Sequence, residues 1–195
     1  SDNLGGLNGY WDGGGGLSIS GSGSATLDFC DISTNRAAPG RGGGLRVAGD
    51  ATLNHCQIVE NESSDSGGGL AITDATGNAV LHSCLISNNT NDQGSHRGDG
   101  LIFYYSGTAT LTCCTVEDTI VKDQGSGGGT YSLVSVSTTA CPSGEFRDGC
   151  TASDAGACTP CTTALGDQYY TGHGGYQDAC PVAMTPPAIM VISEA

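Results

Sequence analysis

The sequence predicts an all-β protein in which a three-sided parallel β-solenoid of about four to five coils precedes an irregular, disulfide-rich tail. Two observations predict the solenoid. A glycine cluster followed by an aliphatic residue recurs every 25 to 31 residues, and short runs within each repeat alternate apolar and polar side chains. A third observation predicts the tail, because the period stops near residue 139 and closely spaced cysteines follow.

Aligned repeats place equivalent residues in columns. The column after the glycine cluster holds Leu17, Leu45, Leu70 and Leu101, with Thr130 in the last repeat. A cysteine column with steps of 26, 28 and 30 residues holds Cys30, Cys56, Cys84 and Cys114. Five residues later, an asparagine column holds Asn35, Asn61 and Asn89 and is broken by Thr119. In a stacked solenoid each column becomes a ladder of like side chains.

The local pattern of each repeat is that of β-strands. Leu45-Arg46-Val47 alternates, and Gly interrupts every stretch long enough for a helix. Leu53 and Cys56 are three residues apart, so a straight strand cannot point both inward and a corner must separate them. Further corners at the asparagine column and after Val47 give a coil of three strands. We expect the Leu and Cys ladders in the core and the Asn ladder at a bend.

The composition excludes several classes of partner. The 195 residues include 33 Gly and 10 Cys, and 20 acidic against six basic residues give a net charge of −14. Nucleic acids and anionic lipids are bound through Lys and Arg, so neither is expected as a partner. No apolar run is long enough for membrane insertion. The acidic surface suits a structural Ca²⁺ ion, and no other cofactor is expected.

The glycine-glycine-aliphatic and Ile-x-x-Asn repeats, such as Ile58 to Asn61, resemble those of right-handed parallel β-helix proteins, the pectin-lyase-like superfamily. The similarity is closest to its non-enzymatic surface members, such as polymorphic outer-membrane and adhesin-type repeat proteins. It covers about residues 13–138 and implies a right-handed β-helix, to which we assign residues 1–138. It does not imply one activity, because the superfamily holds lyases, hydrolases, adhesins and structural proteins.

Residues 139–195 are predicted to form a cysteine-rich module held by disulfides instead of a core. Its five cysteines are Cys141, Cys150, Cys158, Cys161 and Cys180. Their setting is similar to small modules of tumour-necrosis-factor-receptor and ephrin-receptor type. Five is an odd number, and Cys113, beside the ladder residue Cys114, is expected to point away from the core. We predict that Cys113 bonds to one tail cysteine, in a set of three disulfides whose connectivity stays open.

The sequence contains no catalytic constellation that we recognise. Glycoside hydrolases need paired carboxylates, and the pectate lyases of this fold use Ca²⁺-binding Asp with a basic residue. Here the turn aspartates fall at different corners. His55 and His82 occupy different columns, so we expect unstacked surface histidines. Phe103 falls in an inward column, which leaves Tyr104 and Tyr105 as candidates for a sugar- or partner-binding patch.

These observations predict an extracellular structural or adhesive scaffold, a subunit of a cell-surface coat, appendage, filament or matrix. Ten cysteines and the sequons at Asn61 and Asn88 fit a secreted, N-glycosylated protein. Because solenoid ends leave strand edges to be covered, we expect end-to-end stacking with copies of itself or other surface proteins, and contacts with glycans. The alternatives are a polysaccharide-active enzyme of pectate-lyase or polygalacturonase type and a non-catalytic carbohydrate-binding module.

Overall fold

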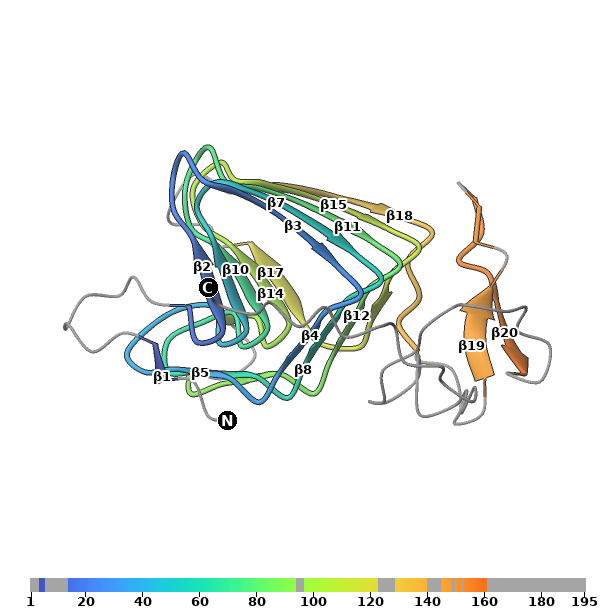
Figure 1. Ribbon diagram of the computed structural model, residues 1–195, viewed down its shortest axis with the longest axis horizontal. Helices are drawn as coiled ribbons and strands as arrows, with labels where there is room; N and C mark the ends of the chain where they lie inside the picture. Colours follow the sequence, from blue (N-terminus) through green and yellow to red (C-terminus); the bar gives the residue numbers. More distant parts are fainter. Residues whose placement is uncertain are drawn as a thin grey trace, which may run out of the picture.

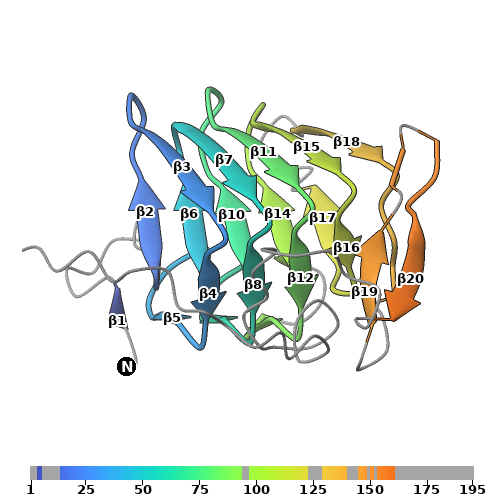
Figure 2. The same ribbon diagram turned by 45° about the vertical axis from the view of Figure 1, so that its right-hand side comes forward.

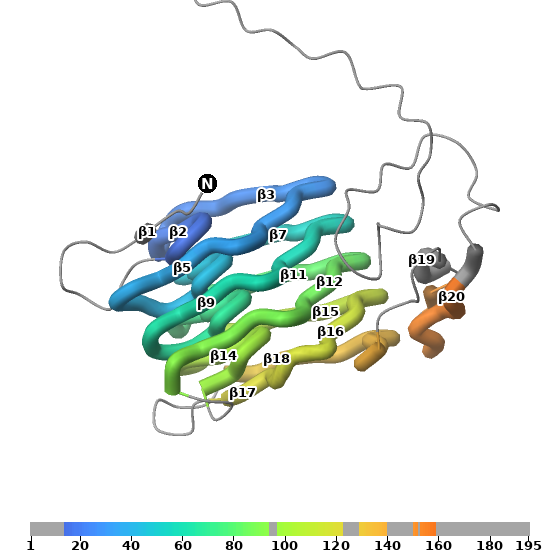
Figure 3. The backbone as a smooth tube through the Cα atoms, turned by 90° about the horizontal axis from the view of Figure 1, so that it is seen from below, coloured from blue at the N-terminus to red at the C-terminus, as the bar shows by residue number. Residues whose placement is uncertain are grey.

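The computed structural model is a stack of short β-coils (Figure 1, Figure 2), which confirms the predicted all-β parallel solenoid. It describes residues 4–5, 14–93, 97–122, 129–139, 145–148, 150–151 and 153–160. Figure 3, a view from below, shows the coils following one another in chain order from the N-terminal to the C-terminal end.

Four parallel sheets run along the solenoid. Sheet A contains β1 (Leu4–Gly5), β5 (Arg36–Ala37), β9 (Glu62–Ser63) and β13 (Thr90–Asn91). Sheet B contains β2 (Leu17–Ile19), β6 (Leu45–Val47), β10 (Leu70–Ile72), β14 (Leu101–Phe103) and β17 (Ile120–Lys122). Sheet C contains β3 (Ser24–Asp28), β7 (Asp50–Asn54), β11 (Asn78–His82), β15 (Thr108–Thr112) and β18 (Thr130–Val134). Sheet D contains β4 (Asp31–Ser33), β8 (Gln57–Val59), β12 (Leu85–Ser87) and β16 (Thr115–Val116).

Strands of neighbouring coils pair in register, so each residue stacks on its equivalent. Leu53 of β7, for example, lies opposite Leu27 on one side and Leu81 on the other. The alternation of the strand points Ala51 and Leu53 into the core and leaves Thr52 partly exposed. Burial of each Leu or Ile stabilises the fold by about 1.5–3 kcal/mol, and the ladders repeat this contribution coil after coil.

Sheets B, C and D are the three sides predicted from the sequence. Sheet A was not predicted: its two-residue strands lie after the asparagine column, in a stretch that the sequence assigned to a loop. Three coils contain all four strands, namely β2–β5, β6–β9 and β10–β13. Among the described residues, β14–β16 and β17–β18 continue the stack without a strand in sheet A, so the four to five predicted coils are three complete and two partial ones.

The corner between sheets C and D uses a residue in the left-handed conformation in every coil. These residues have φ between 53° and 59° and are Phe29, His55, Ser83, Cys113 and Ser135. The corner therefore lies between Leu53 and Cys56, where side-chain parity required one. A second left-handed column, at Thr34, Glu60 and Asn88, precedes the asparagines. Because this conformation costs about 1–3 kcal/mol for a non-glycine residue, stacking on neighbouring coils must hold it.

The described part of the tail contains a small antiparallel pair, β19 (Glu145–Asp148) and β20 (Ala157–Pro160). Figure 2 shows this hairpin at the C-terminal end of the stack, beyond β16 and β18. A disulfide joins this region to the last complete corner, between Cys113 and Cys150.

Candidate functional site

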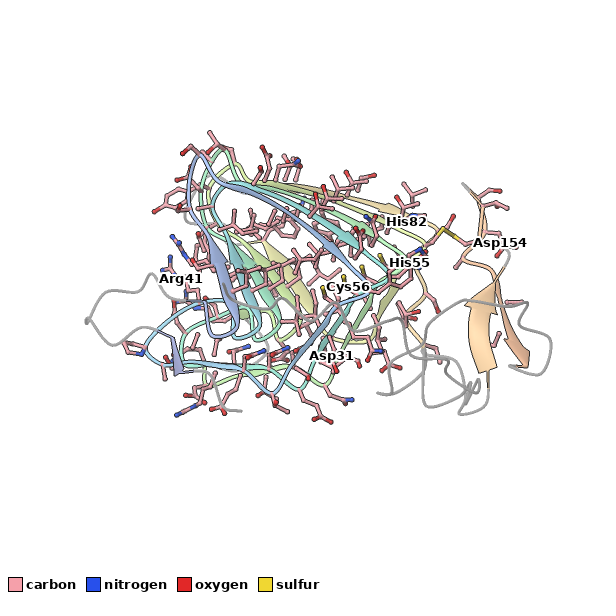
Figure 4. All side chains as sticks on the ribbon, viewed as in Figure 1. Asp31, Arg41, His55, Cys56, His82 and Asp154 are labelled. Atoms are coloured by element: carbon pink, nitrogen blue, oxygen red, sulfur yellow. A yellow bond between two sulfur atoms is a disulfide. The ribbon has the colours of Figure 1, made fainter. Side chains whose placement is uncertain are left out.

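The cysteine column forms a ladder of free thiols inside the corner between sheets C and D. Cys56, Cys84 and Cys114 are buried, whereas Cys30, in the first coil, is half-buried. Figure 4 shows the sulfur atoms in the interior around Cys56. The thiol of Cys56 donates to the carbonyl of Leu27 at 3.3 Å, and that of Cys84 donates to the carbonyl of Leu53 at 3.4 Å. Each sulfur therefore leans toward the preceding coil.

Neighbouring thiols in the ladder change one another's ionisation. A hydrogen bond with the Cys84 side chain is the main cause that lowers the pKa of Cys56 to about 7, although burial acts in the opposite direction. A hydrogen bond with the same Cys84 side chain lowers the pKa of Cys114. Burial raises the pKa of Cys84 well above the ordinary value. The contacts within the ladder therefore raise the pKa of Cys84 and lower those of Cys56 and Cys114.

The asparagine column forms a continuous hydrogen-bonded ladder at the end of sheet D. Nδ2 of Asn35 donates to Oδ1 of Asn61 at 3.0 Å, and Nδ2 of Asn61 donates to Oδ1 of Asn89 at 3.0 Å. The same two oxygens also accept the backbone N–H groups of Asn35 and Asn61. Each inner amide therefore bonds to the coils on both sides, which satisfies buried polar groups that no sheet partner reaches.

The last glycine of each cluster makes room for this ladder. A Cβ atom at Gly16, Gly44 or Gly69 would lie 2.8 to 3.0 Å from the amide group of the asparagine in the same coil. That distance is too short for ordinary contact, so the glycine before each Leu and the asparagine after each Cys depend on each other. Gly42, Gly67 and Gly98, at the start of the clusters, have positive φ and turn the chain into sheet B.

Asp118 is the fourth member of the ladder, and the alignment that placed Thr119 there is wrong. The carboxylate of Asp118 accepts Nδ2 of Asn89 at 2.7 Å and the backbone N–H of Asn89 at 3.1 Å. Thr119 lies outside the ladder, where its Oγ1 accepts the N–H of Asp99. The last bend comes one residue earlier than in other coils, and a fixed count from Cys114 missed it. Burial is the largest influence on the Asp118 carboxyl and raises its pKa, while the bonds from Asn89 oppose the increase.

The two sequons have different environments. Asn61 is fully buried, and both its Nδ2 and its Oδ1 are engaged in the ladder. A glycan on that nitrogen would break the ladder, so the prediction of Asn61 as an N-glycosylation site is wrong for the folded chain. Asn88 is exposed at the left-handed corner beside it and remains a predicted site.

Tyr104 is buried, which corrects the predicted binding patch. Only 2% of it is exposed, and with Ala71 and Ile102 it forms a small apolar cluster on the outer face of sheet B. Its hydroxyl bonds to Oγ of Ser66 and accepts Nη1 of Arg97 at 3.3 Å. Tyr105 is 49% exposed and remains a candidate on its own.

Arg41 extends the surroundings of Tyr104 and was not singled out from the sequence. Its guanidinium lies 4.0 Å from the centre of the Tyr104 ring, and its Nε donates to Asp65 at 2.7 Å. Figure 4 shows Arg41 outside sheet B. Arg41, Asp65, Ser66 and Arg97 belong to the connections that follow sheet A, which fold back over the outer face of sheet B. Arg41 and Ser66 are bridged in parallel, and with Arg97 they form a column directly before the first glycine of each cluster. The residue type changes along this column, so the repeat pattern did not point to it.

The histidines at the corner between sheets C and D are in contact, contrary to expectation. His55 and His82 do occupy different columns, but their ring centroids are 5.9 Å apart with an edge-to-face angle of 81°. On its other side His55 stacks in parallel on Phe29 at 4.9 Å. The left-handed backbone of His55 turns its ring across the coils. Burial and then the neighbouring His82 lower the pKa of His55.

The tail cysteines lie partly outside the described residues. Cys113, which the sequence predicts to bond with a tail cysteine, is bonded to Cys150. Cys158 is also disulfide-bonded. Cys141, Cys161 and Cys180 lie outside the described residues, so the predicted total of three disulfides stays a prediction.

The two end coils of the solenoid leave core positions partly open. At the N-terminal end the inward residues Leu17, Leu27 and Cys30 are only partly buried, whereas their equivalents in the next coil are fully enclosed. At the C-terminal end Leu133 occupies the inward column of sheet C yet is 45% exposed. Tyr131 covers part of that end, since its ring stacks on Phe103 at 5.3 Å beneath the ammonium of Lys122.

Comparison with known proteins identifies the family. A family model described as right handed beta helix region matches residues 5–140, more than half of the chain. The protein therefore belongs to the right-handed β-helix family. Comparison with curated proteins and with solved structures gave no significant match.

Two features are absent from the described residues. In that part of the chain, no helix has the length and apolarity needed to span a bilayer. Within the same residues, no three His, Cys, Asp or Glu side chains gather in a way that would hold a metal ion.

Replacement of Asp118 should separate its role as an acceptor from the cost of its charge. Because the pKa of Asp118 is raised on folding, the fold favours the protonated carboxyl. Its contribution to the free energy of unfolding is lost as pH rises through the folded pKa. At pH 7 Asp118→Asn should therefore be more stable than the wild type, with an advantage that shrinks near pH 4. Asp118→Ala should lose about 1–3 kcal/mol, because two buried N–H groups lose their acceptor.

Urea unfolding of each variant at pH 7 and pH 4 measures these differences. Asp50→Asn, which makes the same charge change at an exposed position of sheet C, is the matched control and should leave the pH dependence unaltered. Equal pH dependence in the wild type and Asp118→Asn would contradict this role of Asp118.

The thiols of the ladder should differ in their access to reagents. Iodoacetamide added to the folded protein should modify Cys30 first, because Cys30 is half-buried at an open end. Burial raises the pKa of Cys30, so the rate should increase with pH. Cys84 and Cys114 should react only after unfolding. Peptide mapping by mass spectrometry measures the rates, Cys30→Ser should remove the fast phase, and equal rates at Cys30 and Cys84 would show that the ladder is not closed.

Proposed function

We propose that this protein is a structural or adhesive subunit of an extracellular coat, appendage, filament or matrix, assembled by end-to-end contact of solenoids. The observation that carries the proposal is the partial exposure of inward core positions at both end coils. Core positions of the inner coils, such as Leu53 and Leu111, are fully buried. The same columns at the ends have no further coil among the described residues to cover them.

The strand edges at the two ends support the same proposal. Among the described residues, β2, β3 and β4 pair on one side only, and so do β17 and β18. The outer side of β16 carries a single parallel bridge, from Thr115 to Ser137. Unpaired edges of parallel sheets present N–H and C=O groups in the register that another coil requires. A second solenoid stacked on either end would extend the sheets and cover positions such as Leu17 and Leu133.

Several features support an extracellular setting and a scaffold. The Cys113–Cys150 disulfide is of the kind that persists in oxidising compartments. The net charge of −14 favours solubility at high concentration. The resemblance to surface and adhesin-type members of the pectin-lyase-like superfamily and the receptor-like setting of the tail cysteines agree with this setting, and contacts with glycans would suit an adhesive role.

Self-association is the first test. Sedimentation velocity of the wild type should show larger species as protein concentration increases. Leu27→Lys places a charge at the N-terminal end coil and should weaken the association by at least tenfold. Thr26→Lys makes a similar change one residue away on the outward face of the same strand and should associate like the wild type. A single monomeric species over a wide concentration range, with folding verified by circular dichroism, would contradict the proposal.

Glycosylation is a separate test of the extracellular setting. When the chain is secreted from eukaryotic cells, Asn88 should carry a glycan and Asn61 should not, since Asn61 is inside the ladder. Intact-mass measurement should show the loss of one glycan in Asn88→Gln. A glycan on Asn61 in folded protein would contradict the ladder, and an unmodified Asn88 in secreted protein would remove this support for the setting.

A further inference from the structure

The thiol ladder contains four nucleophilic sulfur atoms that the proposed scaffold role does not use. Cys30, Cys56, Cys84 and Cys114 are free, although Cys113, the immediate neighbour of one of them, is in a disulfide. Their columns are in register through the adjoining strands of sheets C and D. The ladder is therefore a straight row of thiols, one in each of the first four coils.

The spacing of the row suits a particular coordination geometry. Neighbouring parallel strands are about 4.8 Å apart. All four thiols bond to the carbonyl two residues before them, and this shared orientation keeps the spacing of the sulfurs close to that of the strands. Two metal–thiolate bonds of about 2.3 Å, end to end, span about 4.6 Å. An ion midway between two stacked sulfurs would thus lie at bonding distance from both.

The surroundings limit each position to two soft donors. The ladder is packed within the apolar core that contains Leu53, Leu81 and Ile86, and the described residues offer no group of three ligands. Zn²⁺ requires four ligands and Ca²⁺ requires several oxygens. Thiolate donors favour soft ions such as Cu(I).

We propose that neighbouring thiols of the ladder form linear, two-coordinate sites for soft monovalent metal ions of the Cu(I) and Ag(I) class. Four stacked thiols form two pairs of neighbours that share no sulfur, Cys30–Cys56 and Cys84–Cys114. The N–H of Cys30 donates to Sγ of Cys56, and the N–H of Cys84 donates to Sγ of Cys114, both at 3.4 Å. These donors offset the single negative charge that remains when two thiolates bind one monovalent ion. The sites are therefore Cys30–Cys56 and Cys84–Cys114.

Binding at each site exchanges two S–H bonds for two metal–sulfur bonds. Two protons leave, and no electron is transferred, because the ion enters in its +1 state and the thiols become thiolates. Cys30 is half-buried at the N-terminal end coil and gives the first site direct access. The second site is enclosed by neighbouring coils, so it should fill more slowly.

The test uses the folded full chain, with its disulfides intact, titrated with Ag(I) in chloride-free buffer. Native mass spectrometry should show two silver ions bound per chain, with about two protons released for each ion and an increase in melting temperature. X-ray absorption at the silver edge should show two sulfur neighbours per ion and no nitrogen or oxygen neighbour.

Single replacements assign the sites. Cys56→Ser and Cys84→Ser should each lose one ion, and the double variant should lose both. Serine has nearly the same size and can donate to the same carbonyl. Ile58→Val, a small change in the same core, should keep both ions. Cd²⁺, which prefers four thiolates, should bind at least 100-fold more weakly.

Three results would overturn the proposal. The first is absence of Ag(I) binding to the folded wild type. Binding that occurs only after denaturation counts as such an absence. The second is equal silver binding by the double variant. The third, which does not depend on the variants folding, is an absorption spectrum with three or more ligands per ion in the wild type.

Discussion

In-register stacking of equivalent positions is the constraint on which the rest of the structure depends. Every parallel pair in sheets B, C and D sets a residue against its counterpart one coil away. A residue type that suits one position therefore recurs at the equivalent positions along the solenoid axis. Leu27, Leu53, Leu81 and Leu111 form one such row. The insertions and deletions between coils are confined to turns and to the connections after sheet A, where a change in length does not alter the register of the core.

The polar ladder fixes the cross-section that the apolar ladders fill. Leu, Ile and Val attract one another without preferred direction, and they would tolerate a coil that slipped sideways. The amides of Asn35, Asn61 and Asn89 do not tolerate it, because each must reach the next at about hydrogen-bond distance. Gly44 and its equivalents leave the necessary space. The bend at the end of sheet D is thereby the fixed point of each coil.

The fold could be predicted from the sequence because its determinants recur. Four repeats of Leu and Cys, three of which also have Asn, give both the period and the parity change that requires a corner between Leu53 and Cys56. The details that escaped prediction are those that occur once. Asp118 replaces asparagine one residue early, and only the folded structure shows which side chain meets Asn89. The outward direction of Tyr104 follows from parity, but its burial depends on the connections that carry Arg41 and Asp65, which vary in sequence and length from coil to coil. The thiol row could be placed from sequence, whereas its hydrogen bonds and the contact between His55 and His82 depend on the left-handed corner.

The amide ladder also has a direction. Asparagine both accepts and donates, so it can stand in any interior coil and pass the chain of hydrogen bonds onward. Aspartate only accepts, and Asp118 stands where the row stops. A coil duplicated ahead of Asp118 would lengthen the row and leave every donor matched, whereas one inserted behind it would meet a carboxylate that cannot donate. The solenoid can therefore grow or shorten in evolution on one side of that residue, and a single acidic side chain marks where its regular part ends.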